Sequence, residues 1–212
     1  MDSCYNAPAI SSAGVLNPGR DTCGAVTSPS DGCREPGYLE VNNVYVRTRC
    51  NSGWCAHLYG YYFEVDAKEK CKGHRHDWEH IVVWTENGVA KYVAASAHGS
   101  YEVRPSKDTP WNGDHPKIVY HKDGSSTHAF RFAQADDDVI ENDKGIWFQG
   151  DLVSYYGFPS SELRDRMIHT DWGSAHIAMT DGRLSEALRI AKGSYNIPMD
   201  TNRHDGSMSR PC

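Results

Sequence analysis

Hydrophobic and polar positions alternate through the middle of the chain, as expected for strands that bury one face. Residues 44–50 read VYVRTRC and residues 55–65 read CAHLYGYYFEV, with a short NSGW segment between them that can form a turn. This pattern predicts a β-hairpin. Cys50 and Cys55 flank the turn, and their spacing fits a disulfide that joins the two strands.

Turn residues between apolar runs predict two further hairpins. Asn87-Gly88 separates IVVWTE from VAKYVAAS, and Asp123-Gly124 separates KIVYHK from the run that ends in THAFRF. Asn-Gly is a strong signal because both residues readily adopt the left-handed backbone of a tight turn. Residues 81–84, IVVW, are continuously apolar, which is typical of a central strand covered on both faces.

The two ends of the chain have different patterns. Residues 160–168 (SSELRDRMI) and 181–193 (DGRLSEALRIAKG) place apolar side chains three or four positions apart behind polar capping residues, which predicts two short helices. Residues 1–38 are rich in glycine, proline, serine and cysteine and have little periodicity. We expect this segment to be irregular and to depend on disulfides.

Length and composition narrow the class of protein. A chain of 212 residues favours one domain, 1–212, over two. The twelve tyrosines and six tryptophans, many of them beside turn residues, indicate a β-rich fold. The 22 basic and 28 acidic residues give a net charge of −6, which argues against a nucleic-acid partner. We expect a monomer in solution.

Cysteine usage indicates the compartment. The seven cysteines lack the paired spacing of a zinc ribbon, so disulfides in a secreted protein are the better interpretation. Met1 is followed directly by polar residues, and we expect a mature sequence from which the export signal has been removed. No run approaches the 18 or more apolar residues of a membrane span, so any action on a membrane is expected at its surface.

The most concentrated chemistry lies in residues 73–80, GHRHDWEH. Asp77 and Glu79 are two apart and face the same way in a strand, as suits a hard divalent cation that prefers oxygen ligands. His74 is out of phase with Asp77 unless the chain bends at Gly73, and Asp66, at the end of the preceding strand, is the natural fourth member. A solvated charged loop is the alternative, but these charges lead directly into a buried strand.

Residues 73–79, GHRHDWE, are identical to the heptapeptide signature of the necrosis- and ethylene-inducing peptide 1-like proteins, a family of secreted microbial cytolysins and plant immune elicitors. Residues 56–66, AHLYGYYFEVD, align without gaps with the family's AIMYSWYFPKD. Downstream, SAHGSY, DHPKIVYH, STHAF and TDWGSAH resemble family segments in the same order. The resemblance spans nearly the whole chain. The chain's seven cysteines resemble a cysteine-rich branch of the family.

The resemblance implies a single-domain β-sandwich of antiparallel strands with a few peripheral helices, similar to actinoporin-like cytolysins. The family's metal pocket, which holds Mg²⁺ or Ca²⁺, carries over to Asp66, His74, Asp77 and Glu79. Residues expected around this pocket are Arg75, His76 and the pocket-lining His128. The family is not known for enzymes: toxic members bind the headgroups of plant glycosyl inositol phosphoryl ceramides and then damage the plasma membrane as virulence factors.

The chain departs from the family at positions that matter for toxicity. Toxic members carry a tryptophan in a loop of the form LIxWxxLP, and here residues 152–159 read LVSYYGFP, with Tyr155 as the expected membrane contact. Tyrosine offers less apolar area than tryptophan. In the elicitor segment His57, Gly60 and Tyr61 replace the family's Ile, Ser and Trp.

The remaining expectations concern disulfides and loops. The family's usual bridge maps to Cys4 and Cys33, and Cys212 is a candidate for the one cysteine left over from an odd number. We expect Asp171 to form a turn, and residues 136–138 to form a solvated acidic loop.

Two functional alternatives to a cytolysin stay open. One is a metal-dependent hydrolase in which Asp77 or Glu79 polarises a metal-bound water, although the sequence offers no separate nucleophile or oxyanion stabiliser. The other is a non-lytic elicitor that plant immune receptors recognise.

Overall fold

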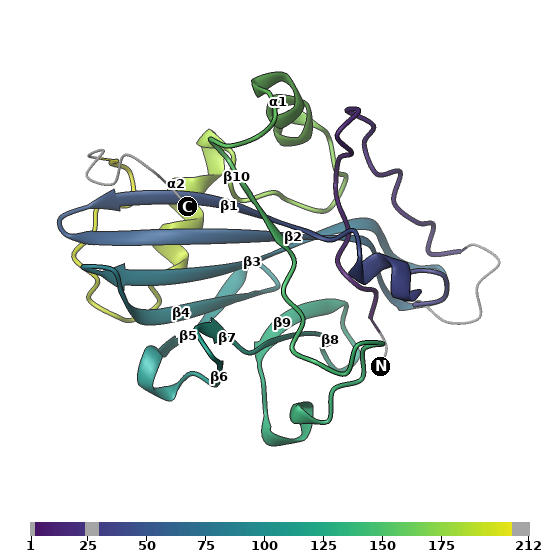
Figure 1. Ribbon diagram of the computed structural model, residues 1–212, viewed down its shortest axis with the longest axis horizontal. Coiled ribbons are helices and arrows are strands. Elements are labelled where there is room, and N and C mark those ends of the chain that lie inside the picture. Colours follow the sequence, from purple (N-terminus) through teal and green to yellow (C-terminus); the bar gives the residue numbers. More distant parts are fainter. Residues whose placement is uncertain (1–2, 24–29, 205–212) are drawn as a thin grey trace.

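The computed structural model describes residues 3–23 and 30–204 (Figure 1). In this part of the chain the largest element is a six-stranded sheet with the order β10-β1-β2-β3-β4-β5. Its strands are β1 (Asn43–Asn51), β2 (Trp54–Glu69), β3 (Lys72–Glu86), β4 (Val89–Ala97), β5 (Ser100–Pro105) and β10 (Asp151–Ser154). Neighbouring strands are antiparallel except β10, which runs parallel to β1.

Smaller elements surround this sheet. Two two-stranded sheets are formed by β6 (Trp111–Asn112) with β7 (His115–Pro116), and by β8 (Ile118–Lys122) with β9 (His128–Phe132). The helices are α1 (Ser161–His169) and α2 (Asp181–Ala191), and the 3-10 turns are η1 (Pro36–Leu39), η2 (Ser106–Asp108) and η3 (Ala135–Asp138). The acidic run 136–138 falls in η3, where Asp137 pairs with Arg131 and Asp138 with Lys117.

The three predicted hairpins are confirmed. Ser52-Gly53 connects β1 to β2 with φ of 54° and 76°, and Asn87-Gly88 connects β3 to β4 with φ of 50° and 80°. Two consecutive left-handed residues twist a tight turn in the same sense as the strands that it joins. The Asp123-Gly124 segment joins β8 to β9.

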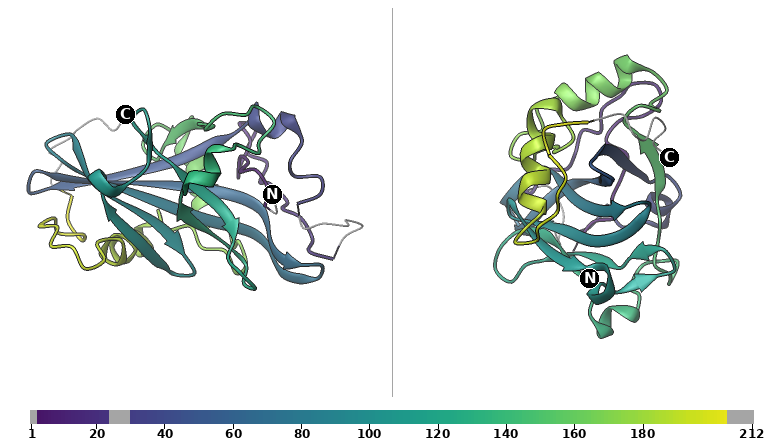
Figure 2. Two further views of the ribbon diagram at one scale, coloured as in Figure 1. Left: turned by 90° about the horizontal axis from the view of Figure 1, so that it is seen from below. Right: turned by 90° about the vertical axis from the view of Figure 1, so that its left-hand side faces the viewer.

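The six-stranded sheet is covered on both faces (Figure 2, right). One face packs against α1 and α2 in a large core that includes Trp84, Met167 and Leu188. The other face packs against the β8–β9 hairpin in a smaller core around Ile81 and Phe130. β3 lies inside the sheet, which confirms the central strand predicted from IVVW.

Both predicted helices are confirmed. The Ser160 hydroxyl accepts a hydrogen bond from Leu163 N at the start of α1, and the Thr180 hydroxyl accepts one from Arg183 N at the start of α2. These caps satisfy backbone donors that the first turn leaves free. The sheets and the two helices confirm the prediction of a mostly β fold with peripheral helices. Neither helix has the length and apolar character of a membrane span, in the part of the chain that the structure describes.

Three disulfides link the cysteines of the described residues. They join Cys4 to Cys33, Cys23 to Cys71, and Cys50 to Cys55. Cys212, expected to be left over, lies outside the described residues. The N-terminal segment lies along the second half of β2. There Ala7 N donates to Tyr62 O (2.9 Å) and Arg20 N donates to Glu64 O (2.8 Å).

Candidate metal centre

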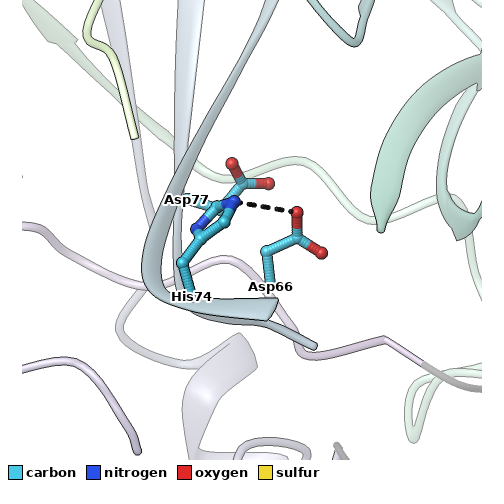
Figure 3. A group of neighbouring side chains, drawn as sticks. All are labelled: Asp66, His74 and Asp77. Atoms are coloured by element: carbon cyan, nitrogen blue, oxygen red, sulfur yellow. Dashed lines mark ion pairs between the residues drawn. The ribbon is translucent and has the colours of Figure 1, made fainter. Parts of the chain in front are cut away.

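The β2–β3 hairpin carries a compact group of three potential metal ligands. Asp66 on β2 lies directly across from His74 on β3, and Asp77 follows on the same strand. One ligand atom from each of these side chains lies within 4.8 Å of the other two. His74 Nε2 is 3.4 Å from Asp66 Oδ2 (Figure 3). The structure thus brings together three of the four residues expected as ligands.

The backbone of β3 is distorted in a way that lets His74 face the two aspartates. Side chains alternate along a regular strand, so His74 and Asp77, three positions apart, would face opposite ways. His76 lies between them with a left-handed φ of 63°, which turns the flanking side chains out of regular alternation while the pairing of β3 with β2 keeps its register. The sequence predicts a bend at Gly73 alone, and the structure adds this second one at His76.

Gly73 is required by the close approach of the two strands. Its φ is 128°, a conformation that side-chain-bearing residues rarely adopt. A Cβ atom here would lie 2.0 Å from the carbonyl oxygen of Asp66. The absence of a side chain therefore lets β3 come close to the backbone that carries the first ligand.

Hydrogen bonds orient the ligand atoms. Asp66 Oδ1 accepts hydrogen bonds from His128 N (2.7 Å) and from His128 Nδ1 (2.9 Å), which leaves Oδ2 toward His74. The carbonyl of His76 can only accept, so His74 Nδ1, 2.8 Å away, carries the hydrogen. In a neutral imidazole, Nε2 then keeps its lone pair for a metal.

Tyr120 completes this arrangement and was not anticipated by the sequence. Its hydroxyl donates to Asp77 Oδ2 at 2.8 Å, and its ring stacks on Phe63 with centroids 3.6 Å apart. Tyr120 comes from β8, whose pairing with β9 places it two positions along from the Lys122–His128 pair. Alternation in the predicted hairpin puts Tyr120 and His128 on one face, which is the signal that could have found it.

The carboxylates of the centre are buried with little compensating charge. Asp66 and Asp77 are 2% and 6% exposed. Burial, and then repulsion by Asp66, raise the pKa of the Asp77 carboxyl to about 7. In the described part of the chain, the ion-pair partners of Asp66 are histidines, and neither aspartate pairs with a lysine or arginine. A cation between these groups would offset the cost of burying their charge.

Glu79 lies outside the group of three. Its Oε2 accepts a hydrogen bond from the Ser96 hydroxyl on β4. Burial, and then the negative charge of Asp77, raise the pKa of its carboxyl well above the usual value. Glu79 therefore adjoins the centre electrostatically, but its carboxylate is turned toward β4.

The three residues expected around the ligands have different contacts. Arg75 turns away, because its Nη1 donates to Pro18 O (2.9 Å) in the N-terminal segment. The His76 ring contacts the Tyr62 hydroxyl (2.6 Å), and only its backbone carbonyl reaches a ligand, His74. His128 is buried and holds Asp66 directly.

The exposure expected for Tyr155 is not found. Tyr155 is 8% exposed, and two guanidinium groups lie over its ring. Arg47 lies 3.9 Å from the ring centroid and Arg164 4.7 Å. The exposed apolar residues of the segment 152–159 are Tyr156 at 55% and Leu152, on β10, at 56%. Elsewhere, Asp171 forms the expected turn by accepting a hydrogen bond from Gly173 N at 2.9 Å.

Comparison of the whole fold with solved structures identifies its class. A structure described as a "toxin fold as basis for microbial attack and plant defense" matches with a TM-score of 0.74 and 25% identity, over 89% of this chain and 82% of that one. HaNLP3, described as non-toxic, matches with a TM-score of 0.73 and 26% identity, over 90% and 84%. The fold is therefore that of the NLP toxin-fold proteins.

Comparison of sequences gives the family. The family model described as Necrosis inducing protein (NPP1) matches residues 1–191, and the chain belongs to this family. NLP effector protein 10 of Phytophthora capsici is 32% identical over 197 residues, which cover 90% of this chain and 77% of the relative. NLP effector protein Pc107869 of the same organism is 31% identical over 194 residues, and this chain spans about half of its length, 52%.

Proposed function

We propose that this protein is a secreted effector that binds one divalent cation through Asp66, His74 and Asp77, and uses this centre to bind sugar headgroups of plant sphingolipids. The observation that carries the proposal is a pair of buried aspartates that face a histidine nitrogen and have no lysine or arginine partner among the described residues. Three disulfides favour an oxidising, extracellular location.

The donor set fits a hard cation. Two carboxylate oxygens and one imidazole nitrogen suit Mg²⁺ or Ca²⁺, which keep open positions for water or ligand oxygens when the protein supplies few donors. Glu79 would join these three ligands only by moving its carboxylate away from Ser96. When bound, the cation supplies positive charge and open coordination positions for hydroxyl or anionic oxygens. His128 and Tyr120 hold the two aspartates in place.

Relatives support a headgroup as the ligand. The chain's relatives are named effector proteins, and their fold is described in the context of microbial attack. NLPPya, which has the same fold at 24% identity, has been solved with mannosamine and with glucosamine. We propose the headgroup of glycosyl inositol phosphoryl ceramides as the target and a non-enzymatic action, damage to the plasma membrane, as the result.

In this proposal the membrane contact is Tyr156 and not the neighbouring Tyr155. Tyr155 is buried, with Arg47 and Arg164 over its ring, and therefore presents little apolar area to a bilayer. Leu152 on β10 and Tyr156 just after it are exposed and supply an aliphatic and an aromatic side chain for the interface.

A non-lytic effector is the second candidate, in which plant immune receptors recognise the protein without membrane damage. It is favoured by the similarity to HaNLP3, which is described as non-toxic, and by a loop with no exposed tryptophan in residues 152–159. Both candidates share the fold, and they differ in whether bound protein permeabilises a membrane.

Dye release from vesicles tests the proposal. Vesicles with and without plant glycosyl inositol phosphoryl ceramides are mixed with wild type or Asp77→Asn, with excess Mg²⁺ or Ca²⁺ or with a chelator. We expect binding and leakage only with wild type, sphingolipid and metal together. Binding without leakage supports the non-lytic candidate. Turnover of a soluble substrate without vesicle binding would support a metal-dependent hydrolase and reject the proposal.

A further inference from the structure

The ligands of the candidate metal centre lie on a part of the β2–β3 hairpin that extends beyond the six-stranded sheet (Figure 1). The pairing of β1 with β2 ends at Tyr45–Gly60, and that of β4 with β3 ends at Ile81–Ala95. Beyond these pairs, β2 and β3 have only each other within the sheet. A two-stranded ribbon is marginally stable by itself, so its geometry depends on what packs against it.

Residues 17–23 of the N-terminal segment provide part of this support. Arg20 N donates to Glu64 O on β2 at 2.8 Å, and Pro18 O accepts from Arg75 Nη1 on β3 at 2.9 Å. At the end of the segment, Thr22 O accepts from Cys71 N at 2.8 Å, and Cys23 forms its disulfide with Cys71. The segment thus contacts both strands and is covalently fastened at the turn between them.

The segment also touches the residue whose backbone brings His74 into the centre. A Cβ atom on Gly19 would lie 2.6 Å from Nδ1 of the His76 ring and 2.8 Å from Cγ of Arg75. His76 has a left-handed backbone within β3, a conformation that is unfavourable for a residue with a side chain. Such a conformation persists only where neighbouring groups hold it.

We propose that the Cys23–Cys71 disulfide is a positioning element for the metal centre: by fastening residues 17–23 along the hairpin, it keeps His74 within reach of Asp66 and Asp77. Cys71 has a left-handed φ of 62° in the turn that leads into β3 and to His74. The proposal rests on the metal site of the proposed function. It predicts that the bridge governs metal affinity, although neither cysteine is a ligand.

The matched test compares two disulfides at opposite ends of β2. Cys23→Ser/Cys71→Ser removes the bridge beside the centre, and Cys50→Ser/Cys55→Ser removes the bridge at the β1–β2 turn. Mg²⁺ and Ca²⁺ affinities are measured by calorimetry on each variant and on wild type. We expect the first pair to weaken binding on the order of tenfold to hundredfold, as for other groups that orient ligands. The second pair is expected to leave affinity unchanged.

Hydrogen exchange provides a readout without metal. In the metal-free proteins, the amides of residues 72–77 are expected to exchange faster in Cys23→Ser/Cys71→Ser than in wild type, with no change in Cys50→Ser/Cys55→Ser. If the first variant does not fold, Gly19→Ala tests the same contact with all bridges intact. Gly99→Ala is its control, since Gly99 also has positive φ (80°) but a Cβ atom there would extend into open space.

The outcomes separate the two proposals. Equal metal affinity in wild type and a folded Cys23→Ser/Cys71→Ser variant, or in a folded Gly19→Ala, overturns the positioning role and leaves the metal site standing. Equal loss in both disulfide variants also overturns it, because the effect then reflects general stability. Wild type that binds neither Mg²⁺ nor Ca²⁺ overturns the metal site itself, and the positioning role with it.

Discussion

The Tyr120 hydroxyl, on the β8–β9 hairpin, donates a hydrogen bond of 2.8 Å to the buried carboxylate of Asp77 on β3. This bond stabilises the ionised form of Asp77 and lowers its pKa, against the larger effect of burial. Because a metal ligand must be deprotonated, Tyr120 favours the form of Asp77 that can bind a cation.

Tyr120→Phe should therefore weaken metal binding near neutral pH. The phenylalanine ring keeps the stacking on Phe63, but the pKa of Asp77 rises further when its donor is lost. Leaving the buried acceptor unsatisfied should also cost about 1–3 kcal/mol of folding stability. Calorimetric titration with Mg²⁺ at pH 7 and pH 9 checks this, and the loss should shrink at the higher pH. Tyr195→Phe, far from the centre, is the control, and an equal effect there would contradict the assignment.

Asp77→Asn should separate metal binding from folding. The amide has nearly the same shape and removes a buried charge, so the metal-free variant is expected to be at least as stable as metal-free wild type. Its Tm should not rise when Mg²⁺ or Ca²⁺ is added, whereas that of wild type should. Asp114→Asn, on the exposed surface, is the control and should respond to metal as wild type does. A metal-induced rise in Tm that persists in Asp77→Asn would remove Asp77 from the ligand set.

The same pair of proteins gives a pH dependence with a defined sign. The pKa of Asp77 in the folded, metal-free protein is about 7, above its ordinary value of 3.8, so the folded state binds more protons between these limits. Wild type should lose stability relative to Asp77→Asn as the pH rises from about 4 to about 7. Burial lowers the pKa of His80 to about 3, so His80 makes stability increase with pH. It is present in both proteins, and its contribution cancels in the comparison. Denaturant unfolding with a chelator present measures this pH dependence, and saturating metal should remove the part that Asp77 contributes in wild type.

Gly73→Ala should disrupt the centre and the hairpin together. The new methyl group would meet the carbonyl oxygen of Asp66, and the backbone has positive φ, so we expect a loss of more than about 2 kcal/mol and of metal binding. Gly88→Ala is matched, because Gly88 also has positive φ in a hairpin turn but open space around it. It should cost only about 1–2 kcal/mol and leave metal affinity intact. Similar losses in the two variants would show that crowding at Asp66 is unimportant.

Tyr155 and Tyr156 should give opposite results when each is replaced by alanine. Tyr155→Ala removes a buried ring that contacts two arginines and should cost about 3 kcal/mol or more in a chemical unfolding experiment. Tyr156→Ala should leave stability within about 0.5 kcal/mol and reduce leakage from sphingolipid vesicles. Unchanged vesicle binding and leakage in Tyr156→Ala would exclude this loop as the membrane contact.

Local sequence patterns predicted the hairpins and both helices because their signals lie within a few residues. Asp66, His74 and Asp77 are brought together by the β2–β3 hairpin, which was not among the three predicted hairpins. The left-handed backbone at His76 could not be read in advance, since a histidine carries no sign of it.

Residues that depend on long-range packing were harder to place. Tyr120 contacts Asp77 and Ser96 contacts Glu79 from other strands, and these contacts exist only once β8 and β4 are in position. The burial of Tyr155 depends on Arg47 from β1 and Arg164 from α1. The sequence around Tyr155 gives no indication that cations from two distant segments will lie over its ring.

The location of the three ligand side chains on one hairpin also bears on the order of folding. Residues 66–77 form contacts that are close in sequence, and such contacts form early because little chain entropy is lost in closing a short loop. The groups that orient the ligands, His128 and Tyr120, arrive from a hairpin about fifty residues later in the chain. A cation present during folding would thus meet its ligands before their supporting hydrogen bonds exist, and would gain affinity as the second hairpin docks.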